Sequence, residues 1–144
     1  MTQETHRLRD EEATRALAAD LVRRFGPGAV FALHGGLGAG KTRFAQGVAR
    51  ALGVQGIVAS PTFAIVLEHR TASGGRFVHM DLYRLDDERE AEDLGFAELV
   101  ENAEATAVEW PDVAESLLPP RTVHVTLDTP PDAPGTRVAT LRIP

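Results

Sequence analysis

A glycine-rich stretch of the chain has the residue types and spacing of a phosphate-binding loop. Residues 35–42, Gly-Gly-Leu-Gly-Ala-Gly-Lys-Thr, match the pattern G-x-x-x-x-G-K-[ST]. Glycines let successive backbone N–H groups converge on a phosphate, and the positive end of a following helix strengthens that attraction. In such a loop the lysine contacts the β- and γ-phosphate oxygens, and the threonine hydroxyl is a ligand of Mg²⁺. The predicted nucleotide-binding residues are Gly36, Leu37, Gly38, Ala39, Gly40, Lys41 and Thr42.

The lysine of this loop is the only lysine in the chain. The chain has 15 lysine and arginine residues, and all of them except Lys41 are arginines. A compact ammonium is needed where a planar guanidinium would not fit. The position of Lys41 in the last part of the motif therefore favours a functional loop over a chance match.

Carboxylates follow two segments that have the pattern of buried strands. Asp81 comes directly after residues 76–80, and Glu109 comes directly after residues 105–108. Ligands of open α/β sheets bind at the carboxyl ends of the strands. A phosphate-binding loop enzyme also needs an acid there, to hold the metal's water shell or to orient an attacking water. We therefore expect at least one of these acids to face the metal, the alternative being a solvated acid at the end of a strand.

Two further residues are candidates for the same site. Thr62, in Ser60-Pro61-Thr62-Phe63, lies on a loop, and a loop threonine can respond to a γ-phosphate and its Mg²⁺. Ser-Pro also opens ordinary turns, which is the structural alternative. Trp110 is the only tryptophan and follows Glu109 directly. Its position predicts a place close to the nucleotide, although a single tryptophan more often packs in a core.

The sequence favours adenine over guanine as the base. The guanine-reading pattern Asn-Lys-x-Asp needs a second lysine, which the chain lacks, and Asn102 is the only asparagine. Asp132-Ala133-Pro134-Gly135 fits D-x-x-G but lies in a proline-rich turn, so we interpret it as accidental. ATP is therefore the expected nucleotide, and Asp10 is a candidate acceptor for the adenine amino group. The five histidines show no metal-ligand spacing and are interpreted as structural.

The elements that must position these residues are those of an α/β protein. Residues 29–34 form an apolar strand before the glycine loop, and residues 42–52 have one apolar helical face after it. Asp10 is a predicted N-cap. The other predicted elements are a helix over 10–25, a hairpin of strands 63–69 and 76–81, short helices at 86–94, 96–102 and 111–118, and antiparallel strands at 122–127 and 137–143.

Composition narrows the class of protein. The 144 residues predict a single domain, 1–144, with 43% hydrophobic residues and no cysteine. No run reaches the ~18 apolar residues of a membrane span, and no signal core is visible at the start, so we expect a cytoplasmic protein without a membrane partner. The net charge of −6 and pI near 5.3 predict poor binding of nucleic acid by the chain alone, and no DNA partner.

Taken together, these motifs resemble the bacterial TsaE (YjeE) ATPases of tRNA threonylcarbamoyladenosine biosynthesis. The resemblance covers nearly the whole chain in order, and the blocks after the loop make it specific. They are LGAGKT at Leu37–Thr42, SPTF at Ser60–Phe63, HMDLYR at His79–Arg84, EDLG at Glu92–Gly95, and VEWP at Val108–Pro111.

The resemblance implies a P-loop NTPase-like fold, with a central parallel sheet flanked by antiparallel strands and helices on both faces. It implies a weak ATPase that acts with TsaD and TsaB, which handle most of the tRNA contact. Their product would be threonylcarbamoylated adenosine (t6A) beside the anticodon of tRNAs that read codons starting with A. By position, Lys41 and Thr42 would bind phosphate and Mg²⁺, Glu109 would be a metal ligand, Asp81 would be needed for hydrolysis, and Thr62 would belong to a nucleotide-responsive loop.

One position departs from that family, which commonly has an acid where this chain has Gly36. The loop keeps its backbone amides, so we expect phosphate binding to survive, without whatever that carboxylate contributes. Two other functions remain alternatives: a small-molecule kinase and a nucleotide-dependent scaffold without hydrolysis. Against the kinase, the chain has no arginine-rich lid segment, and a hairpin takes the place of the helix pair that would bind an acceptor.

Overall fold

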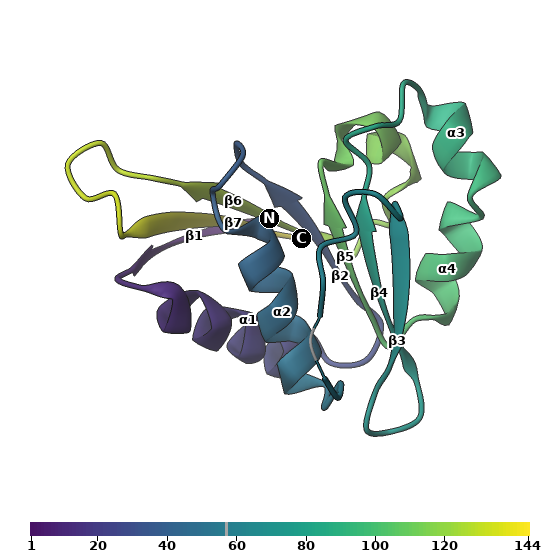
Figure 1. The fold of residues 1–144 in the computed structure, drawn as a ribbon, viewed down its shortest axis with the longest axis horizontal. Coiled ribbons are helices and arrows are strands. Elements are labelled where there is room, and N and C mark those ends of the chain that lie inside the picture. The colour runs from purple at the N-terminus through teal and green to yellow at the C-terminus, as the bar shows by residue number, and fades with distance from the viewer. Residues whose placement is uncertain (57) are drawn as a thin grey trace.

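A seven-stranded mixed sheet forms the centre of the molecule (Figure 1). The computed structural model describes residues 1–56 and 58–144. From one edge to the other, the strands are β1 (Thr2–Leu8), β7 (Arg137–Ile143), β6 (Val123–Asp128), β2 (Ala29–His34), β5 (Ala105–Glu109), β4 (Arg76–Asp81) and β3 (Val66–Arg70).

The middle of the sheet is parallel and its margins are antiparallel. β6, β2, β5 and β4 run in one direction, whereas β7 pairs antiparallel with both β6 and β1, and β3 pairs antiparallel with β4. β2 lies between two parallel partners and is buried from Ala29 to Leu33, as its apolar sequence predicts. The predicted arrangement of a central parallel sheet with antiparallel flanks is confirmed.

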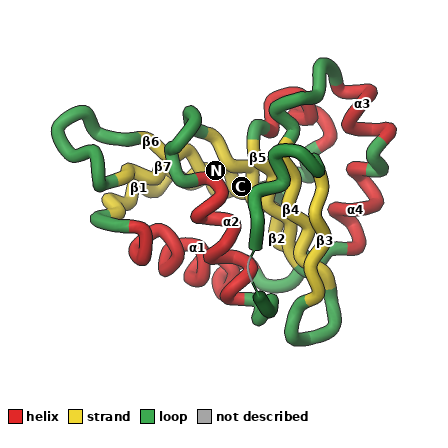
Figure 2. Tube along the Cα trace, in the orientation of Figure 1, coloured by secondary structure: helices red, strands yellow, loops and turns green. Residues whose placement is uncertain are grey.

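Helices cover both faces of the sheet. α1 (Glu11–Phe25) and α2 (Lys41–Ala51) pack on one face, where Phe31 and Leu33 of β2 point. α3 (Glu88–Asp93), α4 (Phe96–Asn102) and the 3₁₀ helix η1 (Pro111–Leu117) pack on the other, where Val30 points. Successive side chains of a strand alternate between faces, so β2 contributes to both cores. Figure 2 shows the two groups of helices separated by the sheet.

α1 and α2 touch closely because a glycine lies between them. A Cβ on Gly47 of α2 would lie only 2.8 Å from the Cβ of Ala18 and 2.8 Å from the Cα of Arg15, both on α1. α1 itself begins as predicted, since the Asp10 side chain accepts a hydrogen bond of 2.8 Å from the N–H of Ala13. Arg15 and Ala18 of α1 therefore lie directly against Gly47 in the middle of α2.

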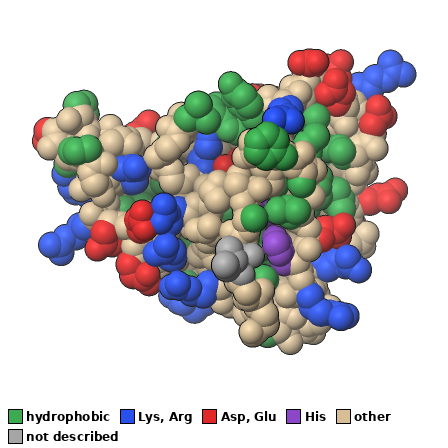
Figure 3. Space-filling model, in the orientation of Figure 1, with side chains coloured by type: hydrophobic (Ala, Val, Ile, Leu, Met, Phe, Trp, Pro, Cys, Tyr) green, Lys and Arg blue, Asp and Glu red, His purple; other side chains and the backbone are tan. Residues whose placement is uncertain are grey.

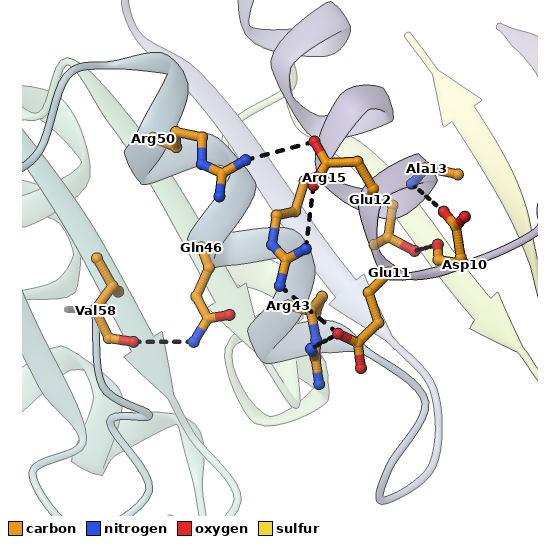
Figure 4. A network of polar contacts seen from close by, with 10 residues as sticks. Asp10, Glu11, Glu12, Ala13, Arg15, Arg43, Gln46, Arg50 and Val58 are labelled. Atoms are coloured by element: carbon orange, nitrogen blue, oxygen red, sulfur yellow. Dashed lines mark hydrogen bonds and ion pairs between the residues drawn. The ribbon is translucent and has the colours of Figure 1, made fainter. Parts of the chain in front are cut away.

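Ion pairs reinforce this placement (Figure 4). Glu11 pairs with Arg43 of α2, and Glu12 pairs with Arg50 of α2 at 3.5 Å. Arg15 lies between the two helices and contacts Glu12 at 3.3 Å. Each such exposed pair contributes little stability alone, but together the charges specify which turn of α1 faces α2.

Two elements differ from the sequence-based expectation. Residues 2–8 form the edge strand β1, which their pattern did not predict, because only Leu8 is buried and the rest are mostly polar. β3 begins at Val66, since the chain turns at 62–64 before it becomes extended. Among the residues that the structure describes, no helix is long and apolar enough to cross a membrane.

Candidate nucleotide-binding site

A large cavity lies at the carboxyl ends of the parallel strands. Its volume is about 520 Å³. Several separate parts of the chain line it: Asp10, Glu11 and Thr14; Leu37 to Arg43; Thr62, Asp81, Glu109 and Trp110; and Pro134, Gly135 and Arg137. This is the edge at which open α/β sheets bind ligands.

The loop between β2 and α2 has a backbone that requires glycine. Gly35, Gly38 and Gly40 have φ values of 145°, 76° and 104°, and a Cβ on Gly35 would lie 2.6 Å from the carbonyl oxygen of Leu127. Gly40 is the N-cap of α2, and among the residues that the structure describes no side chain caps that helix. The first N–H groups of α2 are therefore free of a side-chain acceptor and suited to an anion.

Lys41 lines the cavity and is buried, with 5% of its surface exposed. Its Nζ donates to the carbonyl oxygen of Gly35 at 2.6 Å and lies 3.3 Å from the centre of the Trp110 ring. Burial lowers the pKa of Lys41, while the negative charges of Glu109 and Asp81 oppose that shift. The ammonium thus lies between a backbone carbonyl group and an aromatic face.

Thr42 and Glu109 bring oxygen atoms together beside the lysine. The Thr42 hydroxyl lies 3.0 Å and 3.2 Å from the two carboxylate oxygens of Glu109, which is 3% exposed. A hydroxyl and a carboxylate are ligands that suit Mg²⁺, which also keeps waters and binds substrate phosphates. The residues present therefore fit a magnesium ion bound together with a nucleotide.

Asp81 and Thr62 form a second pair on the far side of Glu109. Asp81 is opposite Glu109 in the parallel register of β4 and β5. Its Oδ1 accepts from the N–H of Tyr83 at 2.9 Å, and its Oδ2 accepts from the Thr62 hydroxyl at 3.3 Å. Ser60 is within 2.6 Å of the same hydroxyl. The Ser-Pro-Thr loop is therefore connected directly to the carboxylate that ends β4.

The structure brings all but one of the sequence-predicted site residues to the cavity. The exception is Gly36, which does not line it. A Cβ on Gly36 would meet no atom within 4 Å, so the local packing does not require glycine there. Asp10 does reach the cavity, with its side chain engaged as the cap of α1.

Other residues at the site were not found by sequence reasoning. Pro134 and Gly135, from the segment interpreted as an accidental motif, line the cavity together with Arg137. His79, interpreted as structural, has its Nε2 2.6 Å from Oε2 of Glu109. His79 belongs to the HMDLYR block and Pro134-Gly135 to the D-x-x-G match, but neither pattern by itself placed these residues at the site, and Arg137 lies in no motif.

Large apolar side chains are exposed around the mouth of the cavity. Leu37, Phe63 and Tyr83 are 83%, 81% and 60% exposed. The Tyr83 ring lies 4.9 Å from that of Trp110, and the Arg84 guanidinium covers the Phe63 ring at 4.7 Å. Figure 3 shows hydrophobic side chains gathered toward the upper edge of this view. The loops that follow the carboxyl ends of the parallel strands lie there. Exposed clusters of this kind typically contact a partner.

Comparisons with known proteins agree on one family. The family model described as "Threonylcarbamoyl adenosine biosynthesis protein TsaE" matches residues 8–137. A Bacillus subtilis protein named tRNA threonylcarbamoyladenosine biosynthesis protein TsaE is 40% identical over 116 residues, which are 81% of this chain and 72% of the relative. A protein of the same name from Haemophilus influenzae is 38% identical over 101 residues, 70% of this chain and 63% of that relative.

A solved structure supports the same relationship. The crystal structure of YdiB from Bacillus subtilis superposes with a TM-score of 0.79 at 31% sequence identity. The superposition covers 99% of this chain and 86% of the other. The likeness therefore extends over the sheet and both groups of helices.

Proposed function

The chain belongs to the TsaE family of tRNA threonylcarbamoyladenosine biosynthesis proteins, and we propose that it binds ATP with Mg²⁺ and hydrolyses it in that pathway. The observation that carries the proposal is the convergence of Lys41, Thr42 and Glu109 at the start of α2. A cation, a hydroxyl and a carboxylate at one end of a glycine loop are the groups that a Mg²⁺–triphosphate needs.

We assign each residue a role that its contacts support. Lys41 would bind the β- and γ-phosphate oxygens, and Thr42 and Glu109 would hold the metal. When bound, Mg²⁺ neutralises charge on those oxygens. Asp81 accepts a hydrogen bond from the attacking water, and Thr62 connects the γ-phosphate to the loop that precedes β3. The contact between Thr62 and Asp81 supports this coupling.

The protein acts together with TsaD and TsaB, which stimulate its slow hydrolysis. The exposed apolar side chains Leu37, Phe63 and Tyr83 at the cavity mouth support contact with a partner protein there. The net charge of −6 supports the proposal that the tRNA is bound mainly by the partner proteins, because a negatively charged chain binds phosphates poorly. The modified nucleoside is t6A beside the anticodon, in tRNAs that read codons starting with A.

Calorimetry of ADP and ATP binding with and without Mg²⁺ tests the nucleotide site. We expect binding by the wild-type chain, and a loss of at least about 100-fold in Lys41→Ala, since charge-assisted hydrogen bonds contribute about 1.5–3 kcal/mol each. Glu109→Gln should keep nucleotide binding and lose most of its dependence on Mg²⁺. An intact, folded wild-type protein that binds neither nucleotide contradicts the proposal.

Phosphate release with and without purified TsaD–TsaB tests the activity. Hydrolysis should be slow alone, should rise with the partners, and should fall in Asp81→Asn and Glu109→Gln. Hydrolysis that is unchanged in both variants would contradict the assigned roles. A phosphorylated small molecule in place of free phosphate would show a kinase instead.

A further inference from the structure

Arg137, at the first position of β7, contacts the phosphate-binding loop from a strand far away in the sequence. Its Nε donates to the carbonyl oxygen of Ala39 at 3.0 Å, and its Nη2 donates to that of Gly38 at 3.0 Å. Its Nη1 donates to the carbonyl oxygens of Pro134 at 2.8 Å and Thr136 at 3.0 Å. One guanidinium therefore bridges the glycine loop and the β6–β7 loop.

We propose that Arg137 is a positioning residue that holds the glycine loop in its nucleotide-binding conformation before the nucleotide arrives. The inference rests on the proposed function of this cavity as a nucleotide site. It goes beyond that function because neither the sequence motif nor the family resemblance assigns any role to this residue.

The first argument is geometric. A guanidinium is planar and presents its N–H donors in a fixed fork, so two adjacent carbonyl groups are held in a defined relative orientation. In a trans peptide the carbonyl and the following N–H point in opposite directions. Because Arg137 binds the carbonyls of Gly38 and Ala39, the following N–H groups are turned away from it. One of them, that of Ala39, donates to the carbonyl oxygen of Gly36 at 3.2 Å.

The second argument concerns the anchor. The backbone of Arg137 is paired with Leu8 of β1 in the antiparallel register, so the arginine extends from a fixed strand. The two contacts to Pro134 and Thr136 fix the direction of its guanidinium. A rigid donor on one side can order a glycine-rich loop without a ligand.

The third argument concerns affinity. Glycines at positions 35, 36, 38 and 40 give this loop many conformations, and ordering them opposes binding. A contact that orders the loop in the free protein removes that cost from the binding step, which raises affinity. Arg137 therefore increases the affinity for a nucleotide without having to contact the nucleotide.

The test compares Arg137→Met with the control Arg142→Met. Arg142 is on the same strand but lines a separate cavity with Gln3 and His124. Two measurements are made: calorimetry with Mg²⁺-ADP, and hydrogen exchange of the amides of residues 35–42 in the nucleotide-free protein. We expect Arg137→Met to weaken binding about 10-fold, as the cost of ordering roughly one backbone residue in the binding step implies. Its loop amides should exchange faster, whereas Arg142→Met should match the wild type in both measurements.

Arg137→Lys provides a second variant, which retains the charge but not the planar fork, and circular dichroism checks that each variant folds. Lysine should restore only part of the affinity and of the slow exchange. Unchanged exchange with weakened binding would show direct contact with the nucleotide and overturn the positioning role. Wild-type values in both measurements would also overturn it. If the wild type bound no ADP, the proposed function would fail, while the exchange of the free protein would still test this contact.

Discussion

His79 is the residue whose contacts most extend the assigned site. It is fully buried, and its Nε2 lies 2.6 Å from Oε2 of Glu109. Within the described part of the chain, its Nδ1 has no hydrogen-bond partner, and its ring stacks on Phe77 at 5.9 Å. This arrangement fits the tautomer in which Nε2 carries the proton and donates it to the carboxylate. Such a donor fixes the orientation of a metal-binding carboxylate.

Replacing His79 should change the response of the protein to Mg²⁺. His79→Leu keeps much of the volume but removes the donor, and loss of such outer contacts typically weakens metal affinity about 10- to 100-fold. His79→Gln retains an N–H donor and should preserve most of that affinity. The measurement is ADP affinity as a function of Mg²⁺ concentration. Equal behaviour of the leucine and glutamine variants would show that the hydrogen bond to Glu109 does not matter.

Trp110 should report the arrival of a nucleotide. The centre of its ring lies 3.3 Å from Nζ of Lys41, so the positive charge is in direct contact with the indole in the free protein. We expect Mg²⁺-ADP to draw the ammonium to phosphate and to change the tryptophan emission. Lys41→Met should have a different starting emission and should not respond. A flat titration of a wild-type protein that binds ADP by calorimetry would place Trp110 outside the responsive site.

At this scale, the sequence could reveal the residues of contiguous motifs but not those that depend on strand register. Lys41 and Thr42 are adjacent in a recognisable loop, and Glu109 and Asp81 each end a strand-like run. Arg137 has no such signal, because its contact with the loop arises only when β7 pairs with β1 and β6. Long-range partners of this kind become visible only in the folded molecule.

At the scale of elements, two histidines join the end of β2 to β6. Nε2 of His34 lies 2.9 Å from Nδ1 of His124, and the rings stack with centres 5.2 Å apart. Burial lowers the pKa of both, and the proximity of His34 and Arg142 lowers that of His124 further. Asp112 on η1 lies 3.8 Å from His34, and its negative charge opposes the lowering of the His34 pKa.

Mild acid should therefore destabilise the contact between β2 and β6. Because the folded-state pKa values lie below the ordinary value of 6.5, the unfolded chain binds protons first as the pH falls. The stabilising contribution is complete above pH 6.5 and is lost as the pH falls through the folded-state pKa values. We expect a decrease in the melting temperature from pH 7.5 to 5.5 that is smaller in His124→Gln. An equal decrease in both proteins would assign the effect to other groups.

The elements themselves were predictable to different degrees. The strand before the loop and the helix after it were expected at 29–34 and 42–52, within a residue of β2 and α2. Their apolar patterns are strong because both elements are buried against the sheet core. β1 carries polar side chains on both faces and lies at the edge of the sheet beside β7, so no periodic pattern marks it. The arrangement of a central parallel sheet with antiparallel flanks came from the family resemblance, and the order of the strands was not predicted, since local patterns do not encode it.

For the whole molecule, the two hydrophobic cores share a strand, and segments from across the chain line the cavity. One core lies under α1 and α2, and the other lies under α3, α4 and η1. Between them, β2 contributes Phe31 to the first and Val30 to the second. The cavity adds residues from Asp10 at the start of α1 to Arg137 at the start of β7. A shared strand and a shared site predict one cooperative unit over residues 1–144.

Thermal unfolding should accordingly show a single transition that a nucleotide moves upward. Circular dichroism reports the helices and Trp110 emission reports the site, so coincident curves from both probes indicate one unit. Mg²⁺-ADP at 100 times its dissociation constant should add about 2.7 kcal/mol of stability, because it binds only the folded state. For a chain of this length, that increase raises the melting temperature by roughly 5–10 °C. Lys41→Ala should melt once but without the shift. Separate transitions for the two probes would contradict the single unit, and an unshifted wild type would contradict nucleotide binding.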